Sequence, residues 1–312
     1  MPWRLFIGIP VILSLAMLSY FDMWIADQLH VRGVLLLPLF LICLCFLCSE
    51  VLDLLEAGGL HPRRSTVYIG TLAVAFFSWF ACIFQEYRSD ILIEVISTHG
   101  WYWAATASLC TLLAMAGGII IAFAGEMLRF TRPGGTTVNL AGAVFAITYI
   151  GILSCFIIQL RMAFGIAAIL SLVVVTKMCD MGAFIVGRIF GHHKMVPGIS
   201  PGKTIEGAIG GVLFGILGAW IWFNLVIPIT FSSRWIHATP NPTSFFGWFS
   251  FGIVVALAGS LGDLAESLIK RDVKRKDSSR WMPGFGGFLD IFDSLLLAAP
   301  LAYAWWAFEL VG

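Results

Sequence analysis

The sequence predicts an all-α integral membrane protein that crosses the bilayer about nine times. Hydrophobic residues make up 59% of its 312 residues, whereas Asp, Glu, Lys and Arg together make up only 12%. So few charged residues cannot cover the surface of a water-soluble globule. Nine apolar runs also approach the length of about 20 residues that a bilayer core requires, and charged residues, Gly or Pro separate them. Lipid is therefore the expected solvent for most of the chain.

The apolar runs follow one another along the whole chain. The first is interpreted as a retained helix, because only Arg4 precedes it and no small-residue cleavage site follows it. The second is short, and tilt of its neighbours or local thinning of the bilayer would accommodate it. The predicted spans are 5–21, 34–48, 67–84, 101–124, 138–158, 163–186, 208–230, 245–264 and 294–311.

Basic residues are unequally divided between the two sides of this predicted topology. Of the 19 lysines and arginines, fourteen fall on the side of the N-terminus, four fall on the opposite side, and Lys177 lies inside a span. The positive-inside rule then predicts a cytoplasmic N-terminus and an external C-terminus. The expected location is the cytoplasmic (inner) membrane.

The ionisable residues also divide the chain along its length. Residues 1–312 are expected to form a single membrane domain, since no soluble domain or long linker interrupts the apolar runs. Residues 1–165 have short loops and few ionisable groups within the spans, so they are interpreted mainly as scaffold helices. Residues 176–294 contain ionisable groups within spans and two loops rich in Gly, Pro, Lys and Arg, so function is expected there.

The sixth run contains Lys177 and Asp180, three positions apart and therefore on the same face of a helix. The opposite charges of such a pair can neutralise each other. Ionisable residues inside a membrane are costly and are functional candidates by default. A purely structural ion pair is the alternative.

The following loop contains Gly202-Lys203-Thr204, which is similar to the end of a nucleotide-binding phosphate loop. That motif needs Gly where Pro197 stands, and no strand is expected before it, so a soluble NTPase is excluded. Ser200, Lys203 and Thr204 still supply hydroxyl and ammonium donors beside the start of the next helix. The free N–H groups at a helix start attract anions.

A second charge-rich stretch follows the eighth run. If that helix extends beyond the membrane, Asp263, Ser267, Lys270 or Arg271, and Lys274 lie along one of its faces. This face would present one carboxylate, one hydroxyl and several cationic groups near the membrane surface.

Two further carboxylates, Asp290 and Asp293, share a face at the start of the ninth helix. Carboxylate oxygens are ligands that Mg²⁺ prefers, and Lys and Arg bind phosphate oxygens. Three acids among many basic residues therefore favour a site where divalent cations and phosphates meet. A juxtamembrane basic patch for anionic lipid is the alternative, but it leaves the three acids unexplained.

Together these two stretches resemble the phosphatidate cytidylyltransferase (CDP-diacylglycerol synthase) family. The family's downstream signature is matched by Ser267, Ile269, Lys270, Arg271, Lys276, Asp277, Ser279, Pro283, Gly286, Gly287, Asp290, Phe292 and Asp293. Its upstream segment is matched by Asp180, Gly187, Arg188, Ser200, Pro201, Lys203, Thr204, Glu206 and Gly207. The chain departs from the pattern at Met282, at Phe285, where the family usually has His, and at Ile291, where it usually has Arg.

The resemblance implies transfer of CMP from CTP to phosphatidate, with Mg²⁺ as the cofactor and K⁺ as a candidate second cation. It implies that Asp263, Asp290 and Asp293 bind the cations and that Lys270 and Arg271 act in catalysis. The residues expected to bind or orient the substrates are Asp180, Arg188, Ser200, Lys203, Thr204, Glu206, Ser267, Lys276, Asp277, Gly286 and Gly287. The active site is expected near the cytoplasmic face, because CTP is cytosolic and phosphatidate lies in the leaflet.

Three alternatives compete with this reading. A CTP-dependent polyprenol or dolichol-type kinase resembles the same Lys203–Gly207 region, but the long downstream signature argues against it. A CDP-alcohol phosphatidyltransferase would need an Asp-Gly-x-x-Ala-Arg motif that the sequence lacks. An ion transporter or channel would use Lys177, Asp180 and Asp263 as an ion path. The expected partners are CTP, phosphatidate and the lipid bilayer, with a homodimer as a candidate assembly and no nucleic acid.

Overall fold

The structure is a computed structural model that describes residues 17–18, 21–22, 24–25, 28, 33, 35–89, 100–131, 133–230, 245–279 and 286–311. The chain divides into two compact units. Unit 1 comprises Met1–Met162 and Asp277–Phe288, and unit 2 comprises Ala163–Lys276 and Leu289–Gly312. The change from one unit to the other at residue 162 lies close to the predicted change of character at residue 165. The single membrane domain stays a prediction.

Within the described residues, seven helical stretches are long and apolar enough to cross a membrane. They are Leu36–Ala57, Arg64–Phe84, Ser108–Arg129, Thr136–Phe164, Ile166–Phe190, Ile205–Thr230 and Phe245–Asp272. These stretches coincide with the second to eighth predicted spans, so a mainly helical chain with many membrane-compatible helices is confirmed. Most of the first predicted span lies outside the described residues, and the ninth corresponds to helix α12 (Leu289–Ala307).

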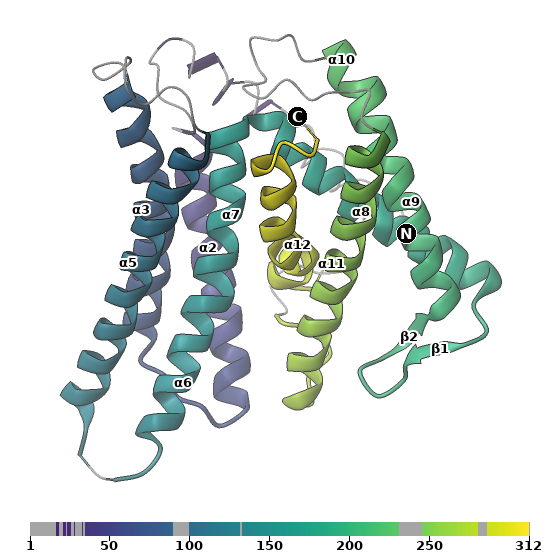
Figure 1. Ribbon diagram of the computed structural model, residues 1–312. Helices are drawn as coiled ribbons and strands as arrows, with labels where there is room; N and C mark the ends of the chain where they lie inside the picture. The colour runs from purple at the N-terminus through teal and green to yellow at the C-terminus, as the bar shows by residue number, and fades with distance from the viewer. Residues whose placement is uncertain are drawn as a thin grey trace. The chain divides into compact units, whose positions relative to one another are not determined.

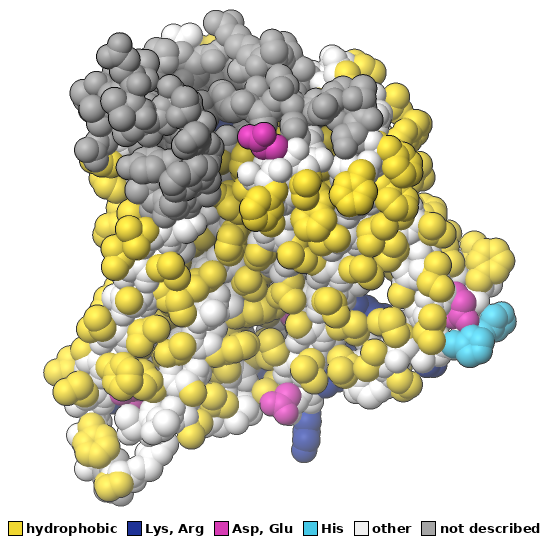
Figure 2. All heavy atoms as spheres, viewed as in Figure 1, with side chains coloured by type: hydrophobic (Ala, Val, Ile, Leu, Met, Phe, Trp, Pro, Cys, Tyr) yellow, Lys and Arg dark blue, Asp and Glu magenta, His cyan; other side chains and the backbone are white. Residues whose placement is uncertain are grey.

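The surface of these helices is suited to lipid. Large hydrophobic side chains such as Leu128 and Ile120 are 81% and 67% exposed. Hydrophobic side chains also dominate the face seen in Figure 2, where charged side chains are few. Exposed apolar area of this extent is unfavourable in water and favourable in a bilayer.

Unit 1 is built from helices α2 (Leu36–Ala57), α3 (Arg64–Ser89), α5 (Gly100–Arg129) and one long interrupted helix. That helix alternates between α and π geometry as α6 (Thr136–Ala146), η1 (Ile147–Ile152), α7 (Leu153–Gln159) and η2 (Leu160–Phe164). Among the membrane-compatible helices of the described residues, the apolar part of this one is buried to the largest extent, and α3 packs against it. The interrupted helix is therefore central to this unit.

The short second run is part of a longer helix than the apolar pattern indicated. Helix α2 continues past Cys48 to Ala57, through a segment that contains Glu50, Asp53 and Glu56. These acids ended the apolar run in the sequence but did not end the helix, because Glu50 is buried and hydrogen-bonded while Asp53 and Glu56 pair with Arg64. The full helix has 22 residues.

Unit 2 contains helices α8 (Ile166–Phe190), α9 (Ile205–Ile221), α11 (Phe245–Asp272) and α12, with η3 (Trp222–Val226) and α10 (Ile227–Thr230) continuing α9. A hairpin of strands β1 (Lys194–Val196) and β2 (Ser200–Thr204) joins α8 to α9, as Figure 1 shows. The expectation that no strand precedes α9 was wrong. The phosphate-loop interpretation still fails, because Lys203 and Thr204 lie in the strand itself.

Glycines let the helices of unit 2 approach closely. A Cβ atom on Gly211 would lie 3.0 Å from Cys179 Sγ of α8, and one on Gly215 would lie 2.7 Å from Ala256 Cβ of α11. The four-residue glycine spacing of α9 therefore allows close helix packing.

The end of α11 corrects one expectation. The helix does extend as far as Asp272, so Asp263, Ser267 and Lys270 belong to it. Lys274 lies beyond the helix with a φ of 55° and does not share the predicted face.

Candidate active site

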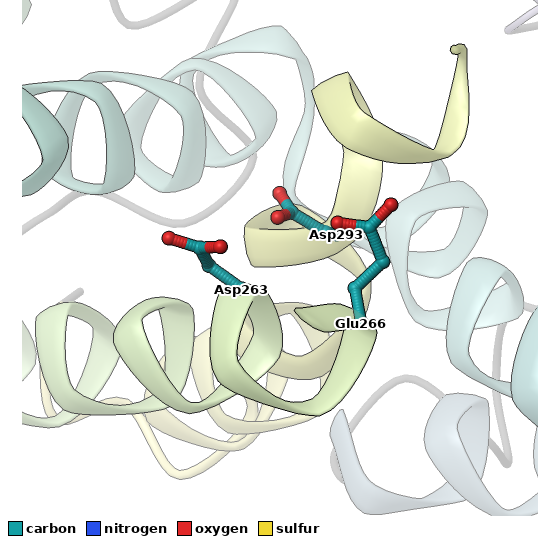
Figure 3. A group of neighbouring side chains, drawn as sticks. All are labelled: Asp263, Glu266 and Asp293. Carbon is teal, nitrogen blue, oxygen red and sulfur yellow. The ribbon is translucent and has the colours of Figure 1, made fainter. Parts of the chain in front are cut away.

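The most concentrated group of carboxylates in the described residues is formed by Asp263, Glu266 and Asp293. One oxygen atom of each lies within 4.8 Å of the others. Figure 3 shows Asp263 and Glu266 on one helix and Asp293 on a second helix, with the three carboxylates close together. Glu266 and Asp293 are only 1% and 6% exposed. We call these three residues the carboxylate cluster.

Local packing explains why the cluster forms. Asp263 and Glu266 are three positions apart on α11 and therefore share a face. A Cβ atom on Gly262 would lie 3.0 Å from Ser294 Cα, so glycine at this position allows α12 to pack directly on α11. This close approach brings Asp293, the neighbour of Ser294, against the acids of α11.

Lys270 lies directly beside the cluster. Its ammonium group donates to Glu266 Oε2 at 2.7 Å and to Asp290 Oδ1 at 2.5 Å, and the residue is 7% exposed. The buried Glu266 and the half-buried Asp290 compensate the buried cation. The predicted cation ligand Asp290 thus lies against Lys270, and Glu266, which the sequence analysis did not select, joins Asp263 and Asp293.

The hairpin brings a second lysine to the cluster. Lys203 Nζ of β2 lies 2.9 Å from Asp263 Oδ2, and the Lys203 side chain is 25% exposed. Ser267 Oγ donates to Asp263 Oδ1 at 3.5 Å from one turn along α11. The structure therefore brings the predicted residues Lys203, Ser267 and Asp263 together.

Contacts fix the hairpin at its base, next to α9, and at the turn between its strands. Thr204 caps α9, with its hydroxyl oxygen accepting from the Gly207 N–H at 3.1 Å. Glu206 accepts from the backbone N–H of His193 at 3.2 Å and also contacts the imidazole of His193 at 2.6 Å. Arg271 donates to the carbonyl of Ile199 at 3.2 Å. Thr204, Glu206 and Arg271 therefore position the hairpin that presents Lys203.

Helix α8 adds a third lysine. Lys177 Nζ lies 3.2 Å from Asp180 Oδ2, and both side chains are 45% exposed. Asp180 interacts electrostatically with Asp263, and Lys177 with Asp293. The ion pair between Lys177 and Asp180 that the sequence predicted is confirmed, and it lies beside the carboxylate cluster.

The remaining predicted residues are dispersed. Arg188 is exposed, and its guanidinium carbon lies 5.9 Å from the centre of the Phe184 ring. Ser200 begins β2 opposite Val196. Lys276 and Asp277 are exposed on the segment that follows α11.

Gly286 and Gly287 belong to unit 1, as does Asp277. Ile291, where the family pattern has Arg, lies in the first turn of α12 and is partly exposed. Phe285 lies outside the described residues.

Helices compatible with a membrane, a cluster of three carboxylates and adjoining lysines define a membrane protein with a site suited to phosphate chemistry. Carboxylates bind divalent cations, and lysines bind phosphate oxygens. The chain belongs to the cytidylyltransferase family, whose model, described as "Cytidylyltransferase family", matches residues 10–308.

Similar bacterial proteins support this assignment. The chain is 32% identical over 213 residues to a protein of Staphylococcus aureus, covering 68% of this chain and 74% of the relative. It is 32% identical over 244 residues to a protein of Staphylococcus haemolyticus, covering 74% and 88%. It is 31% identical over 211 residues to a protein of Staphylococcus epidermidis, covering 68% and 74%. All three relatives are named phosphatidate cytidylyltransferase.

Proposed function

We propose that this chain transfers the cytidylyl group of CTP to phosphatidate, forming CDP-diacylglycerol and pyrophosphate. The carboxylate cluster beside Lys203 and Lys270 is the observation that carries the proposal, together with membership of the cytidylyltransferase family. Both substrates are polyanions, so a site for their reaction must bring cationic groups to two phosphate-bearing molecules.

The residues of the cluster fit a divalent cation. Glu266 Oε1 is buried and has no hydrogen-bond partner among the described residues, which is costly for a carboxylate oxygen. Among the described residues, the connected group has five carboxylates and three ammonium groups, so its carboxylates outnumber its ammonium groups by two. Its members are Asp180, Asp263, Glu266, Asp290, Asp293, Lys177, Lys203 and Lys270.

Asp263, Glu266 and Asp293 would hold Mg²⁺, with Asp290 acting through Lys270 rather than as a direct ligand. When bound, the ion would polarise the reacting phosphate of CTP and stabilise the departing pyrophosphate. A K⁺ ion beside it is part of the same proposal.

The chemistry requires positioning more than proton transfer. The phosphate of phosphatidate is already anionic at neutral pH, so one of its oxygens can form the new bond to the α-phosphorus of CTP without a strong base. The bond from that phosphorus to the β-phosphate oxygen breaks, and pyrophosphate leaves. Lys203, which is partly exposed and fixed by the hairpin, would contact substrate phosphate, with Arg188 and Lys276 as exposed cations for the outer phosphates.

Lys270 has a different role in this proposal from the one the sequence suggested. Because it is 7% exposed and pairs with Glu266 and Asp290, it would hold these two acids in place. Arg271 would fix the hairpin through Ile199 rather than bind phosphate.

The proposal includes a topology. The seven membrane-compatible helices, α12 and the first apolar run would give nine spans with a cytoplasmic N-terminus and an external C-terminus. The hairpin and the end of α11 would then lie at the cytoplasmic face of the inner membrane, which both substrates can reach. A homodimer is a candidate assembly within the same proposal.

Product identification tests the proposal. Purified protein in mixed micelles is incubated with CTP, phosphatidate and Mg²⁺, and the lipid and aqueous products are identified by mass spectrometry. CDP-diacylglycerol and pyrophosphate in equal amounts are expected. Formation of CDP and a phosphorylated lipid would favour the kinase, and ion movement across liposomes without turnover of CTP would favour the transporter.

A further inference from the structure

A buried glutamate of unit 1 binds both ends of the segment that precedes α12. Glu50 of α2 is 5% exposed. Its Oε2 atom accepts a hydrogen bond from Ser278 Oγ at 2.9 Å, and its Oε1 atom accepts one from the Phe288 N–H at 2.9 Å. The donors lie 228 and 238 positions along the chain from Glu50. A buried carboxylate is costly unless hydrogen bonds compensate it, so these contacts fix Ser278 and the Phe288 backbone firmly.

Two glycines directly before Phe288, Gly286 and Gly287, shape the backbone beside Glu50. A Cβ atom on Gly287 would overlap both Glu50 Oε2 and Ser278 Oγ. Gly286 has a φ of 84°, which residues with a side chain rarely adopt. Gly286 and Gly287 therefore allow the backbone to lie close to the Glu50 carboxylate.

An aromatic contact fixes the same end of the segment. Phe46, one helical turn before Glu50, stacks on Phe288 with ring centres 4.8 Å apart and planes inclined by 7°. Residues four positions apart share a helix face. Helix α2 thus holds Phe288 by its backbone through Glu50 and by its ring through Phe46.

Phe288 is adjacent in the chain to the acids of the candidate site. Leu289 begins α12, Asp290 follows Phe288 by two positions, and Asp293 follows it by five. We propose that Glu50 is a positioning residue for cytidylyl transfer, which fixes Ser278 and Phe288, the backbone directly before the helix that carries Asp290 and Asp293. This inference rests on the proposed function. It assigns a role in the reaction to a helix that its sequence identifies only as scaffold.

According to the inference, the hydrogen bonds of Glu50 matter for the reaction and its negative charge does not. Glutamine at position 50 keeps the carbonyl oxygen for the Phe288 N–H, and its amide can donate to Ser278 Oγ, since a hydroxyl both donates and accepts. Alanine removes both bonds. Misplacement of reacting groups by about 1 Å is enough to reduce a rate by about 100-fold. Alanine should therefore reduce kcat strongly, and glutamine should preserve much of it.

The test compares Glu50→Ala and Glu50→Gln with a matched control, Glu126→Ala. Glu126 is also a glutamate of unit 1 that is 5% exposed, but its ion pair is with Arg129. We expect Glu50→Ala to lower kcat at least tenfold, and Glu50→Gln and Glu126→Ala to stay within about threefold of the wild type. The KM for CTP should change less than kcat in Glu50→Ala.

Hydrogen exchange measures the contact itself. Peptides covering residues 277–288 should exchange faster in Glu50→Ala than in Glu126→Ala. If Glu50→Ala does not fold, Ser278→Ala replaces it, because this variant removes only one of the two bonds and should give a smaller effect in the same direction.

Three results would show whether the inference about Glu50 or the proposed function is wrong. Equal kcat in Glu50→Ala and Glu126→Ala would overturn the inference. Loss of activity in Glu50→Gln as large as in Glu50→Ala would also overturn it, because the negative charge and not the hydrogen bonds would then matter. A wild-type protein that forms no CDP-diacylglycerol would instead refute the proposed function, while the exchange measurement would still report on the Glu50 contact.

Discussion

Replacing Asp293 by asparagine should impair the proposed cation site without destabilising the fold. Asp293 is 6% exposed and lies with Asp263 and Glu266 in the carboxylate cluster. Its Oδ1 atom accepts a hydrogen bond from the Ser294 N–H, which the asparagine carbonyl can keep. Asp293→Asn therefore removes one negative charge with little change in volume or backbone contacts.

The expected effects on stability and activity have opposite signs. Two unit charges 4.8 Å apart, the limit on oxygen separations in the cluster, repel by about 3 kcal/mol at an effective dielectric constant of about 20. Relief of this repulsion should leave Asp293→Asn at least as stable as the wild type without Mg²⁺. Loss of a cation ligand should nevertheless lower the rate of cytidylyl transfer at least about 100-fold, or roughly 2.7 kcal/mol of transition-state stabilisation.

Two assays on the same purified samples test this prediction. Thermal unfolding is measured with and without Mg²⁺, and a ligand that binds only the folded state at about 100 times its Kd stabilises the wild type by about 2.7 kcal/mol. The variant should gain much less. Asp53→Asn is the control, because it removes a charge from an acid whose side chain is 42% exposed and which pairs with Arg64. Stabilisation of Asp293→Asn by Mg²⁺ equal to that of the wild type, or retention of more than a tenth of its activity, would refute the reasoning.

Three further predictions follow from the site. Lys270→Met should lower the free energy of unfolding by about 3–5 kcal/mol, because it removes the cation that pairs with the buried Glu266. Unchanged thermal unfolding would contradict this. Thr204→Ala should lower the free energy of unfolding by about 1 kcal/mol, because it removes the hydroxyl that caps the Gly207 N–H. Thr204→Ser keeps this hydroxyl and should not lower it. Equal melting temperatures of the two variants would exclude the capping role. Chelation with EDTA should abolish CDP-diacylglycerol formation and added Mg²⁺ should restore it, so full activity in EDTA would exclude a divalent cation.

The helices were largely predictable because membrane-compatible length and composition are local properties of the sequence. The second predicted span ended too early, since Glu50 interrupts the apolar run while its carboxylate is satisfied by donors more than 200 positions away. The β1–β2 hairpin was missed because β1 has only three residues, while β2 has five that include Pro201 and Gly202 and carry no alternating apolar pattern. The hairpin depends instead on antiparallel pairing of Lys194 with Thr204 and of Val196 with Ser200.

The candidate site was predictable in its chemistry but not in its arrangement. Helical spacing alone places Asp290 and Asp293 on one face, yet it cannot show that Lys270 meets Asp290 while Asp293 meets the acids of α11. Glu266 carried an available signal, since it is three positions from Asp263 and four from Lys270. The contact of Glu50 with the segment before α12 had no such signal, because it depends on tertiary packing.

The fate of two labels in CTP tests the central claim most directly. Parallel reactions contain purified protein, phosphatidate, Mg²⁺ and CTP labelled at either the α- or the γ-phosphate. We predict that the α-label enters the organic phase as CDP-diacylglycerol and that the γ-label stays in the aqueous phase as pyrophosphate, with both transfers reduced in Asp293→Asn. Entry of the γ-label into lipid, with the α-label retained in aqueous CDP, would contradict cytidylyl transfer.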